Sequence, residues 1–226
     1  MALFDVHDLS RVYRRGRERL NAVDIPQLVL RPRESVAIVG PSGSGKTTLL
    51  QLLGGLDRPS TGSIQYAGLD LASQPDRSLT RLRVSDFGFV FQQFCLIPTL
   101  TARQQIETAL SPSSLNKSDR SDRAAGLLEA VGLSARARHL PGQLSGGEQQ
   151  RIAIARALAN SPKVLLADEP IGSLDADTGD EILNLLFDFS RQDRVLIVVT
   201  HNQRVARRAD RIIELRSGRI ALDSAA

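Results

Sequence analysis

The sequence predicts an α/β fold with a mostly parallel sheet, an antiparallel β lobe and an inserted helical subdomain. Two observations support this prediction. Short apolar, β-favouring runs recur along the chain, and helical patterns lie between several of them, which is typical of a parallel sheet covered on both faces. The middle of the chain lacks convincing runs of this kind, so we expect helices alone there.

The expected elements follow in chain order. The first third indicates antiparallel strands, including residues 20–30 and 63–66. The apolar strands of the main sheet are expected at 35–39, 87–91, 164–167, 195–199 and 211–215. Between residues 101 and 133 we expect a helix, a loop at 111–114 and a second helix. A further helix follows Gly147, and another follows Asp177 and Thr178, which can cap it; both show apolar residues at helical spacing.

The length of 226 residues is sufficient for one domain with a sizeable core. We expect the β lobe and core to comprise residues 1–92 and 161–226, and the helical subdomain to comprise about 93–160. The longest apolar run has five residues, from Val195 to Val199, so no membrane span is expected. The first residues do not resemble a signal peptide. A single cysteine, Cys95, excludes an intrachain disulfide and fits a reducing compartment.

The formal net charge is +4, and six arginines lie between Asn202 and Arg219. This local excess is either a solvated surface or a patch that faces anionic lipid or an acidic partner. Aromatic residues make up only 4% of the chain, so stacking platforms for single-stranded nucleic acid are scarce. We therefore expect no nucleic-acid partner.

A phosphate-loop pattern lies directly between a predicted strand and a helical run, which is the context that it requires. Its residues are Gly40, Pro41, Ser42, Gly43, Ser44, Gly45, Lys46 and Thr47. The glycines allow backbone N–H groups to point at phosphate oxygens, and the helix dipole favours the same anion. Lys46 is then expected to reach the β- and γ-phosphates, and Thr47 to offer its hydroxyl to Mg²⁺. The pattern predicts a P-loop NTPase core.

Two carboxylates end the apolar strand at 164–167. Beside a phosphate loop, Asp168 is expected to hold Mg²⁺ through water, and Glu169 to polarise the attacking water. Neighbouring strand residues point in opposite directions, so the strand has to end here to free Glu169.

A second anion cradle is expected where Ser145, Gly146 and Gly147 precede a helix. One loop already surrounds the triphosphate at residues 40–47. A second site at a distance therefore suggests that it serves a nucleotide held by another copy of the chain.

The order of these motifs resembles that of ABC-type ATP-binding subunits over nearly the whole chain. The matching residues are the phosphate loop, Gln92, Leu144-Ser145-Gly146-Gly147-Glu148, Asp168-Glu169, Ser173-Leu174-Asp175 and His201. Three further runs are similar to the lipoprotein-releasing, macrolide-efflux and cell-division group of these ATPases. They are Pro41 to Leu50, Gly54 to Pro59, and Phe89 to Phe94.

The resemblance implies a role for each matching residue. Tyr13 would stack on adenine, and Gln92 would touch Mg²⁺ or the lytic water and sense a membrane partner. Asp175 would tie two protomers together, and His201 would bind the γ-phosphate and orient Glu169. Catalytic roles fall on Glu169, His201, Gln92 and Lys46, and Mg²⁺ contacts on Thr47, Gln92 and Asp168. Nucleotide contacts fall on Tyr13, Gly40 through Thr48, Ser145, Gly146, Gly147 and Asp175.

Three departures from the group pattern stand out: Ile171 replaces a usual threonine, Cys95 a usual asparagine, and Arg103 to Ile106 an acidic-asparagine-valine run. The last two lie where a membrane subunit would dock, so they bear on partner identity. His7 and His139 have no motif context, and no role is expected for them.

The resemblance implies an ATP hydrolase that forms a homodimer around two ATP with Mg²⁺. It would drive two separate membrane permease subunits that dock near Gln92 to Thr101, on the cytoplasmic face of the bacterial inner membrane. Export of a lipoprotein or a hydrophobic, peptide-like substrate is the expected function. The alternative is a cell-division or mechanotransmission complex that moves no solute. A nucleic-acid ATPase is a weaker alternative, because such proteins usually carry two cassettes or a long coiled-coil insertion, and neither is present in this sequence. A purely structural partner is the weakest alternative, because the catalytic set is complete.

Overall fold

The computed structural model describes residues 2–16, 18–172, 174–190 and 194–225. In this part of the chain the strands form two sheets, with the orders β2-β1-β4-β5 and β10-β9-β3-β8-β7-β6. The first sheet is antiparallel and contains β1 (Phe4–Arg15), β2 (Glu18–Leu30), β4 (Thr61–Tyr66) and β5 (Leu69–Asp70). The α/β prediction with an antiparallel β lobe is confirmed.

The second sheet has a parallel centre. Its strands are β3 (Ser35–Val39), β6 (Phe87–Val90), β7 (Val164–Asp168), β8 (Val195–Val199), β9 (Arg211–Arg216) and β10 (Arg219–Asp223). Within this sheet the described strand pairings are parallel, except that β10 pairs antiparallel with β9. The five predicted strands of this sheet are found within one residue of their expected ends, and β10 was not predicted.

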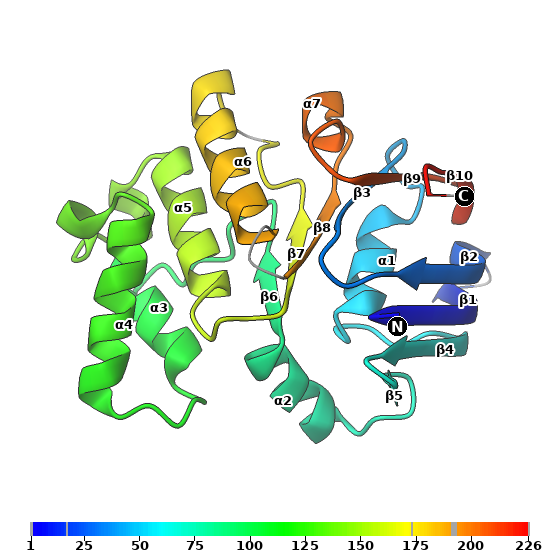
Figure 1. Cartoon of the computed structure of the whole chain (residues 1–226), viewed down its shortest axis with the longest axis horizontal. Helices are drawn as coiled ribbons and strands as arrows, with labels where there is room; N and C mark the ends of the chain where they lie inside the picture. The colour runs from blue at the N-terminus through cyan, green and yellow to red at the C-terminus, as the bar shows by residue number, and fades with distance from the viewer. Residues whose placement is uncertain (1, 17, 173, 191–193, 226) are drawn as a thin grey trace.

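Helix α1 (Lys46–Leu53) lies between the two sheets (Figure 1). Its leucines share one core cluster with β1, β2 and β4 and with the α1-facing residues of β3, β7 and β8. The opposite face of the parallel sheet packs against α6 (Ala176–Ser190) and α7 (Gln203–Ala206). Residues of β7 alternate between these two clusters, so the two faces of the strand are buried separately. Helix α2 (Asp76–Ser85), which was not predicted, leads into β6.

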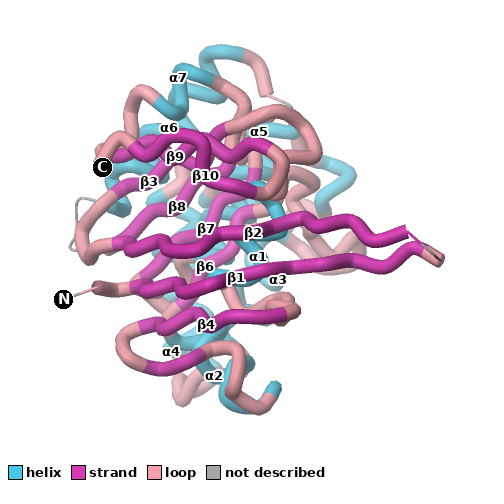
Figure 2. Tube along the Cα trace, turned by 90° about the vertical axis from the view of Figure 1, so that its right-hand side faces the viewer, coloured by secondary structure: helices cyan, strands magenta, loops and turns pink. Residues whose placement is uncertain are grey.

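The middle of the chain folds into the helices α3 (Ala102–Leu110), α4 (Lys117–Ala130) and α5 (Gly146–Ala157), with two short 3₁₀ turns at Ser134–Arg136 and Pro141–Gln143. These helices have a hydrophobic cluster of their own, formed by residues between 102 and 159. In Figure 1 they lie on one side of the sheet, opposite β1, β2 and β4. Figure 2 shows the long β1–β2 hairpin on the side that faces the viewer, with the helices behind it.

One capping prediction was wrong. Asp177 and Thr178 do not cap α6 but lie inside its first turn. The Asp175 carboxylate accepts a hydrogen bond from the Thr178 backbone N–H at 3.0 Å, so Asp175 satisfies the start of the helix. The spacing of the apolar residues predicts where the body of the helix lies. It does not identify the capping residue, because several residues before it are of types that can cap a helix.

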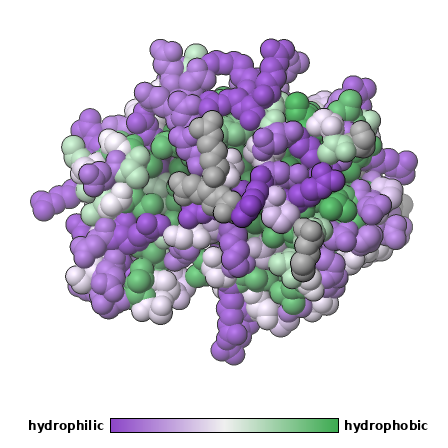
Figure 3. All heavy atoms as spheres, in the orientation of Figure 1, coloured by the Kyte–Doolittle hydropathy of each residue, from purple (hydrophilic) through white to green (hydrophobic). Residues whose placement is uncertain are grey.

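No helix in the described part of the chain combines the length and the apolar character that crossing a bilayer requires. The face seen in Figure 3 is covered mainly by hydrophilic side chains, between which the hydrophobic areas are small and scattered.

Candidate functional site

The loop between β3 and α1 folds around its own lysine. The Nζ of Lys46 donates hydrogen bonds to the carbonyl oxygens of Gly40 and Pro41, both at 2.9 Å, and the residue is only 8% exposed. Gly45 has a φ of 99°, and a Cβ there would lie 2.1 Å from the carbonyl oxygen of Ala22. This close approach requires glycine. The loop that is expected to cradle phosphate is therefore held in a defined conformation by contacts within the chain.

Ser44 supplies a direct indication of a ligand in this loop. The residue is 3% exposed, and its hydroxyl is buried without a hydrogen-bond partner among the described residues. An unpaired buried hydroxyl is costly unless a bound group satisfies it. Phosphate oxygens fit this requirement, because they accept the hydrogen bond that the hydroxyl can donate.

Asp168 lies beside the start of α1. Val164 and Leu166 of β7 face α1, and strand alternation carries Asp168 to the same face. Burial raises the pKa of the Asp168 carboxyl, and Glu169 adds to the rise by repulsion; a hydrogen bond from the Thr47 side chain and the charge of Lys46 oppose it. The Thr47 hydroxyl and the Asp168 carboxylate form a pair of oxygen donors, which fits Mg²⁺ held largely by phosphates and water.

Glu169 is held by the residues that follow β8. Its Oε1 accepts hydrogen bonds from the backbone N–H of His201 at 3.0 Å and lies 2.7 Å from the Nδ1 of His201. Its Oε2 accepts one from the Thr200 hydroxyl at 3.1 Å. The backbone of Glu169 has a φ of 44°, which is uncommon for a residue other than glycine. Such local strain is often found at functional sites.

Gln92 follows β6 and is exposed. Its Nε2 lies 3.6 Å from the position that a Cβ on Gly172 would take, so the side chain reaches the turn after Glu169. Two polar side chains hold the segment that follows. Gln105, 2% exposed, donates to the carbonyl oxygens of Ile97 and Leu100 at 2.6 and 3.1 Å. Arg156 of α5 donates to the carbonyl oxygens of Phe94, at 2.7 Å, and Cys95.

Tyr13 lines a cavity of about 210 Å³ together with Leu20, Ala22 and the phosphate-loop residues Gly43, Gly45, Lys46, Thr47 and Thr48. Its hydroxyl donates to the Asp57 carboxylate at 2.8 Å. The structure thus brings the expected adenine platform beside the expected phosphate cradle.

Ser145, by contrast, lies far from the phosphate loop of its own chain. The starts of α5 and α1 lie at the same edge of the molecule but on opposite sides of β7 and β8 (Figure 1). Ser145 caps α5: its side chain accepts from the Glu148 backbone N–H at 3.2 Å, and the Glu148 carboxylate accepts from the Ser145 backbone N–H at 2.8 Å. The hydrogen bond from the Ser145 backbone N–H, followed by the one from Arg136, lowers the pKa of the Glu148 carboxyl.

The start of α5 packs against the start of α6. A Cβ on Gly147 would lie 2.4 Å from the Cγ2 of Thr178, and Thr178 is bonded in turn to Asp175. A Cβ on Gly146 would lie 3.7 Å from Leu174 and 3.9 Å from Phe94. Gly147 and Asp175 are therefore linked within one protomer. Ser173, the first residue of the motif that ends in Asp175, lies outside the described residues.

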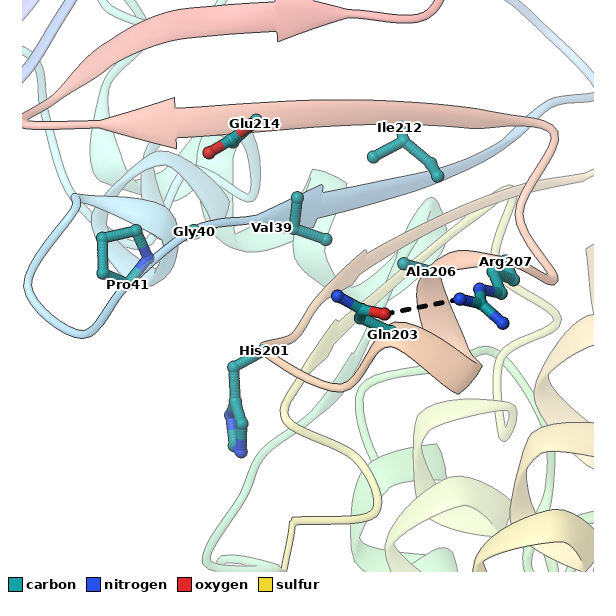
Figure 4. Close-up of a pocket in the computed structure, with 9 residues that line it drawn as sticks. All are labelled: Val39, Gly40, Pro41, His201, Gln203, Ala206, Arg207, Ile212 and Glu214. Atoms are coloured by element: carbon teal, nitrogen blue, oxygen red, sulfur yellow. Dashed lines mark hydrogen bonds between the residues drawn. The ribbon is translucent and has the colours of Figure 1, made fainter.

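A second cavity, of about 440 Å³, adjoins the phosphate loop. Figure 4 shows Gly40 and Pro41 on one side of it, and Gln203 of α7 and Arg207, which follows α7, on the other. His201 also lines it, whereas Gln203, Arg207 and Glu214 were not predicted as site residues. Thr200, Gln105 and Arg156 were missed as well. They carry no motif of their own and become apparent only through their contacts.

The arginine excess at 202–219 is largely paired within the chain. Arg204 contacts Asp180 at 2.6 Å, Arg219 contacts Asp24 at 2.6 Å, and Arg216 contacts Glu214 at 2.7 Å. Arg211, whose side chain is 9% exposed, lies between Asp223 and Glu34. This pairing favours a structural use of the charge over a free basic patch.

Comparison with known proteins supports this geometry. Residues 23–172 match the family model described as ABC transporter. The chain is 45% identical over 222 residues to the macrolide export ATP-binding/permease protein MacB of Hyphomonas neptunium, and 44% identical over 222 residues to MacB 2 of Aeromonas hydrophila. Each match covers 98% of this chain but 34% of the relative, so the chain spans about a third of their length.

Two solved structures match nearly end to end. The dimeric ABC transporter cassette MJ0796 superposes with a TM-score of 0.92 at 40% identity, covering 98% of this chain and 97% of that one. Its dimeric post-hydrolysis state bound to ADP and Pi superposes with a TM-score of 0.90 at 39% identity and the same coverage. The chain belongs to the ABC transporter family and is an ATP-binding, ATP-hydrolysing cassette of it.

Proposed function

We propose that two copies of the chain close head to tail around two ATP molecules. One observation carries this proposal: the phosphate loop and the start of α5 are both built to receive an anion at the same edge, but lie apart in one protomer (Figure 1). Two antiparallel copies bring the start of α5 of one protomer to the phosphate loop of the other. The solved cassette MJ0796, which is similar over 98% of this chain, is a dimer.

In this arrangement Gly40 through Thr48 cradle the phosphates of one nucleotide and Tyr13 stacks on its adenine. Ser145, Gly146 and Gly147 of the second protomer complete the γ-phosphate site, and Asp175 joins the protomers. Thr47, Asp168 and Gln92 would hold Mg²⁺, which neutralises charge on the phosphate oxygens when it is bound.

Glu169 acts as the general base. Its Oε1 already holds two contacts with His201, whereas Oε2 accepts only the Thr200 hydroxyl among the described residues. A carboxylate oxygen has two lone pairs, so Oε2 retains one to accept a proton from water. Lys46 stabilises the developing phosphate charge, and His201 holds Glu169 and contacts the γ-phosphate.

Gln92 to Thr101 form the surface that meets the membrane permease. Arg156 and Gln105 hold this segment against the helical subdomain, so closing of the dimer moves it together with α5. We propose that the ATPase works peripherally, at the cytoplasmic face of a bacterial inner membrane, and drives export of a lipoprotein or a hydrophobic, peptide-like substrate through two permease subunits. The relatives named above are macrolide exporters, which supports a hydrophobic cargo.

The dimer is tested with Glu169→Gln, analysed by size-exclusion chromatography with and without ATP. We expect an ATP-dependent shift to the mass of a dimer, and Ser145→Arg should abolish that shift. A monomer at saturating ATP would contradict the proposal.

Transport is tested by reconstituting the ATPase with its permease in vesicles: ATP-driven loss of cargo supports export, whereas ATP turnover with no cargo movement supports the mechanical alternative.

A further inference from the structure

Three side chains close a triangle at the edge of the Tyr13 cavity. The Tyr13 hydroxyl donates to Oδ2 of Asp57 at 2.8 Å, and Nη2 of Arg11 lies 2.8 Å from Oδ1 of the same carboxylate. The guanidinium carbon of Arg11 lies 4.6 Å from the centre of the Tyr13 ring. The side chains of Arg11 and Asp57 are 24% and 22% exposed, so water screens their pairing only in part.

The backbone explains why these residues meet. Arg11 and Tyr13 are two apart on β1 and so share one side of the strand. The register against β2 shifts between Arg11 and Val12, which leaves Ala22 as an extra residue opposite them. Ala22 lines the same cavity as Tyr13, and its carbonyl oxygen lies against Gly45. The bulge thus brings the β1–β2 hairpin close to the phosphate loop.

Asp57 comes from the other end of α1. The backbone N–H groups of Leu56 and Asp57 both bond to the carbonyl oxygen of Gln51, at 2.9 and 3.3 Å. Beyond Asp57 the chain is joined to β1, because the Ser60 backbone N–H donates to the Ser10 carbonyl oxygen at 2.7 Å and the Val12 N–H donates to the Ser60 hydroxyl at 3.0 Å. Helix α1 therefore begins with Lys46 and Thr47, and the segment after its end carries Asp57, whose carboxylate anchors Tyr13.

We propose that Asp57 and Arg11 are positioning residues that set the Tyr13 ring for the nucleotide base. The inference rests on the proposed stacking of adenine on Tyr13. Arg11 covers one face of the ring, so a base stacks on the other face. Asp57 fixes the hydroxyl and thereby the rotation of the ring. Asp57 lies in the run from Gly54 to Pro59, which has no catalytic group. The positioning role therefore gives this run a part in nucleotide binding.

The test is a double-mutant cycle on the purified chain, read as KM and kcat for ATP. Tyr13→Ala should raise KM roughly tenfold, because a stacking contact is lost. Asp57→Asn should raise KM about threefold with kcat unchanged, because the isosteric amide loses the ion pair with Arg11 and weakens the bond to Tyr13. In the Tyr13→Ala background Asp57→Asn should not change KM further, because Asp57 affects nucleotide binding only by holding the Tyr13 ring. Asp76→Asn is the matched control, because Asp76 forms an exposed pair with Arg58 next to Asp57 and should leave KM unchanged.

Tripolyphosphate, which has phosphates but no base, separates positioning from damage to the fold. Its inhibition constant against ATP should be the same in the wild type, Asp57→Asn and Arg11→Met. A rise in that constant, or additive effects of Tyr13→Ala and Asp57→Asn, would overturn the positioning role. If Tyr13→Ala itself leaves KM unchanged, the stacking in the proposed function is wrong; if only Asp57→Asn and Arg11→Met leave it unchanged, the positioning inference alone fails.

Discussion

The carboxylate of Glu169 and the imidazole of His201 form one fixed unit. Two contacts join them, at 2.7 Å to the ring Nδ1 and 3.0 Å to the backbone N–H, and the Glu169 side chain is 13% exposed whereas that of His201 is 70% exposed. The largely buried carboxylate is thus held by an exposed residue that also lines the cavity beside Gly40 and Pro41. A ligand that contacts the His201 ring is therefore sensed at Glu169 through a direct bond.

Replacing Glu169 with glutamine should abolish turnover and leave ATP binding intact. The amide keeps the size of the side chain and an acceptor for Thr200, but it cannot take a proton from water. We expect kcat to fall by a factor of about 100 to 10,000, as for the loss of a general base. Phosphate release assays measure this change, with Glu107→Gln on α3 as a control that removes a half-buried carboxylate of an i,i+4 pair. Hydrolysis at the wild-type rate would show that another group is the base.

Replacing His201 with alanine should lower kcat while Glu169 remains in place. The variant loses the ring contact at 2.7 Å but keeps the backbone donor and the Thr200 hydroxyl, so the carboxylate is held less firmly. We expect a fall of roughly 100-fold, and a smaller one for Thr200→Val, which removes the longer bond to Glu169 together with the bond that the hydroxyl accepts from the Asn202 backbone N–H. Single-turnover rates at saturating ATP distinguish this loss from weaker binding. A Thr200→Val variant slower than His201→Ala would contradict the assignment.

The chemistry-bearing side chains could be predicted because each lies at a strand or helix end that local patterns mark. The phosphate loop follows the apolar strand ending at Val39, and Asp168 and Glu169 follow the apolar run at 164–167, so both lie at the carboxyl ends of parallel strands, which share one edge of the sheet. The groups that hold them could not be predicted. Gln105 bonds to residues eight and five positions away, and Arg156 to residues more than sixty positions away, so their partners depend on how the helices pack.

Adding a methyl group at Gly147 should destabilise the chain, and a second substitution should restore it. The new Cβ would lie 2.4 Å from Cγ2 of Thr178. Gly147→Ala should therefore lower the free energy of unfolding by about 1–3 kcal/mol. Thr178→Ser removes the clashing methyl group and keeps the hydroxyl, so the double variant should recover most of the loss in thermal melts.

Gly126 provides the matched control for that experiment. It lies exposed inside α4, and a Cβ there would meet nothing within 4 Å. Gly126→Ala should stabilise the chain by roughly 0.5–1 kcal/mol, because alanine is the better helix former. Equal destabilisation by Gly126→Ala and Gly147→Ala would mean that the contact with Thr178 is not the cause.

The pairing of Asp223 with Arg211 should make stability depend on pH in the acid range. The hydrogen bond from Arg211 holds the pKa of the Asp223 carboxyl below its ordinary value. A carboxyl whose pKa is lowered by folding contributes stability that is fully present above its unfolded-state pKa, about 3.9, and is lost as the pH falls through the folded value. Asp223→Asn should cost about 1–2 kcal/mol at pH 7. The difference in the free energy of unfolding between the variant and the wild type, measured with denaturant, should shrink below about pH 4. A difference that stays constant down to pH 2 would contradict the role of the charge.

Replacing Arg156 should loosen the segment that carries Cys95, and limited proteolysis makes this measurable. Phe94 and Cys95 have φ values of 55° and 48°, a conformation that costs side-chain-bearing residues energy, and Arg156 bonds to the carbonyl oxygen of each. Arg156→Lys keeps the charge but offers a point donor in place of a planar fork, so it cannot hold both carbonyls in the same way. We expect cleavage of this segment by chymotrypsin to become about three- to tenfold faster, because the free energy of local opening falls by about 1 kcal/mol. Arg123→Lys, at an arginine that bonds to the carbonyl oxygens of Leu158 and Ala159 instead, should leave the rate unchanged. Equal rates in the wild type and Arg156→Lys would mean that the segment keeps its conformation without the guanidinium.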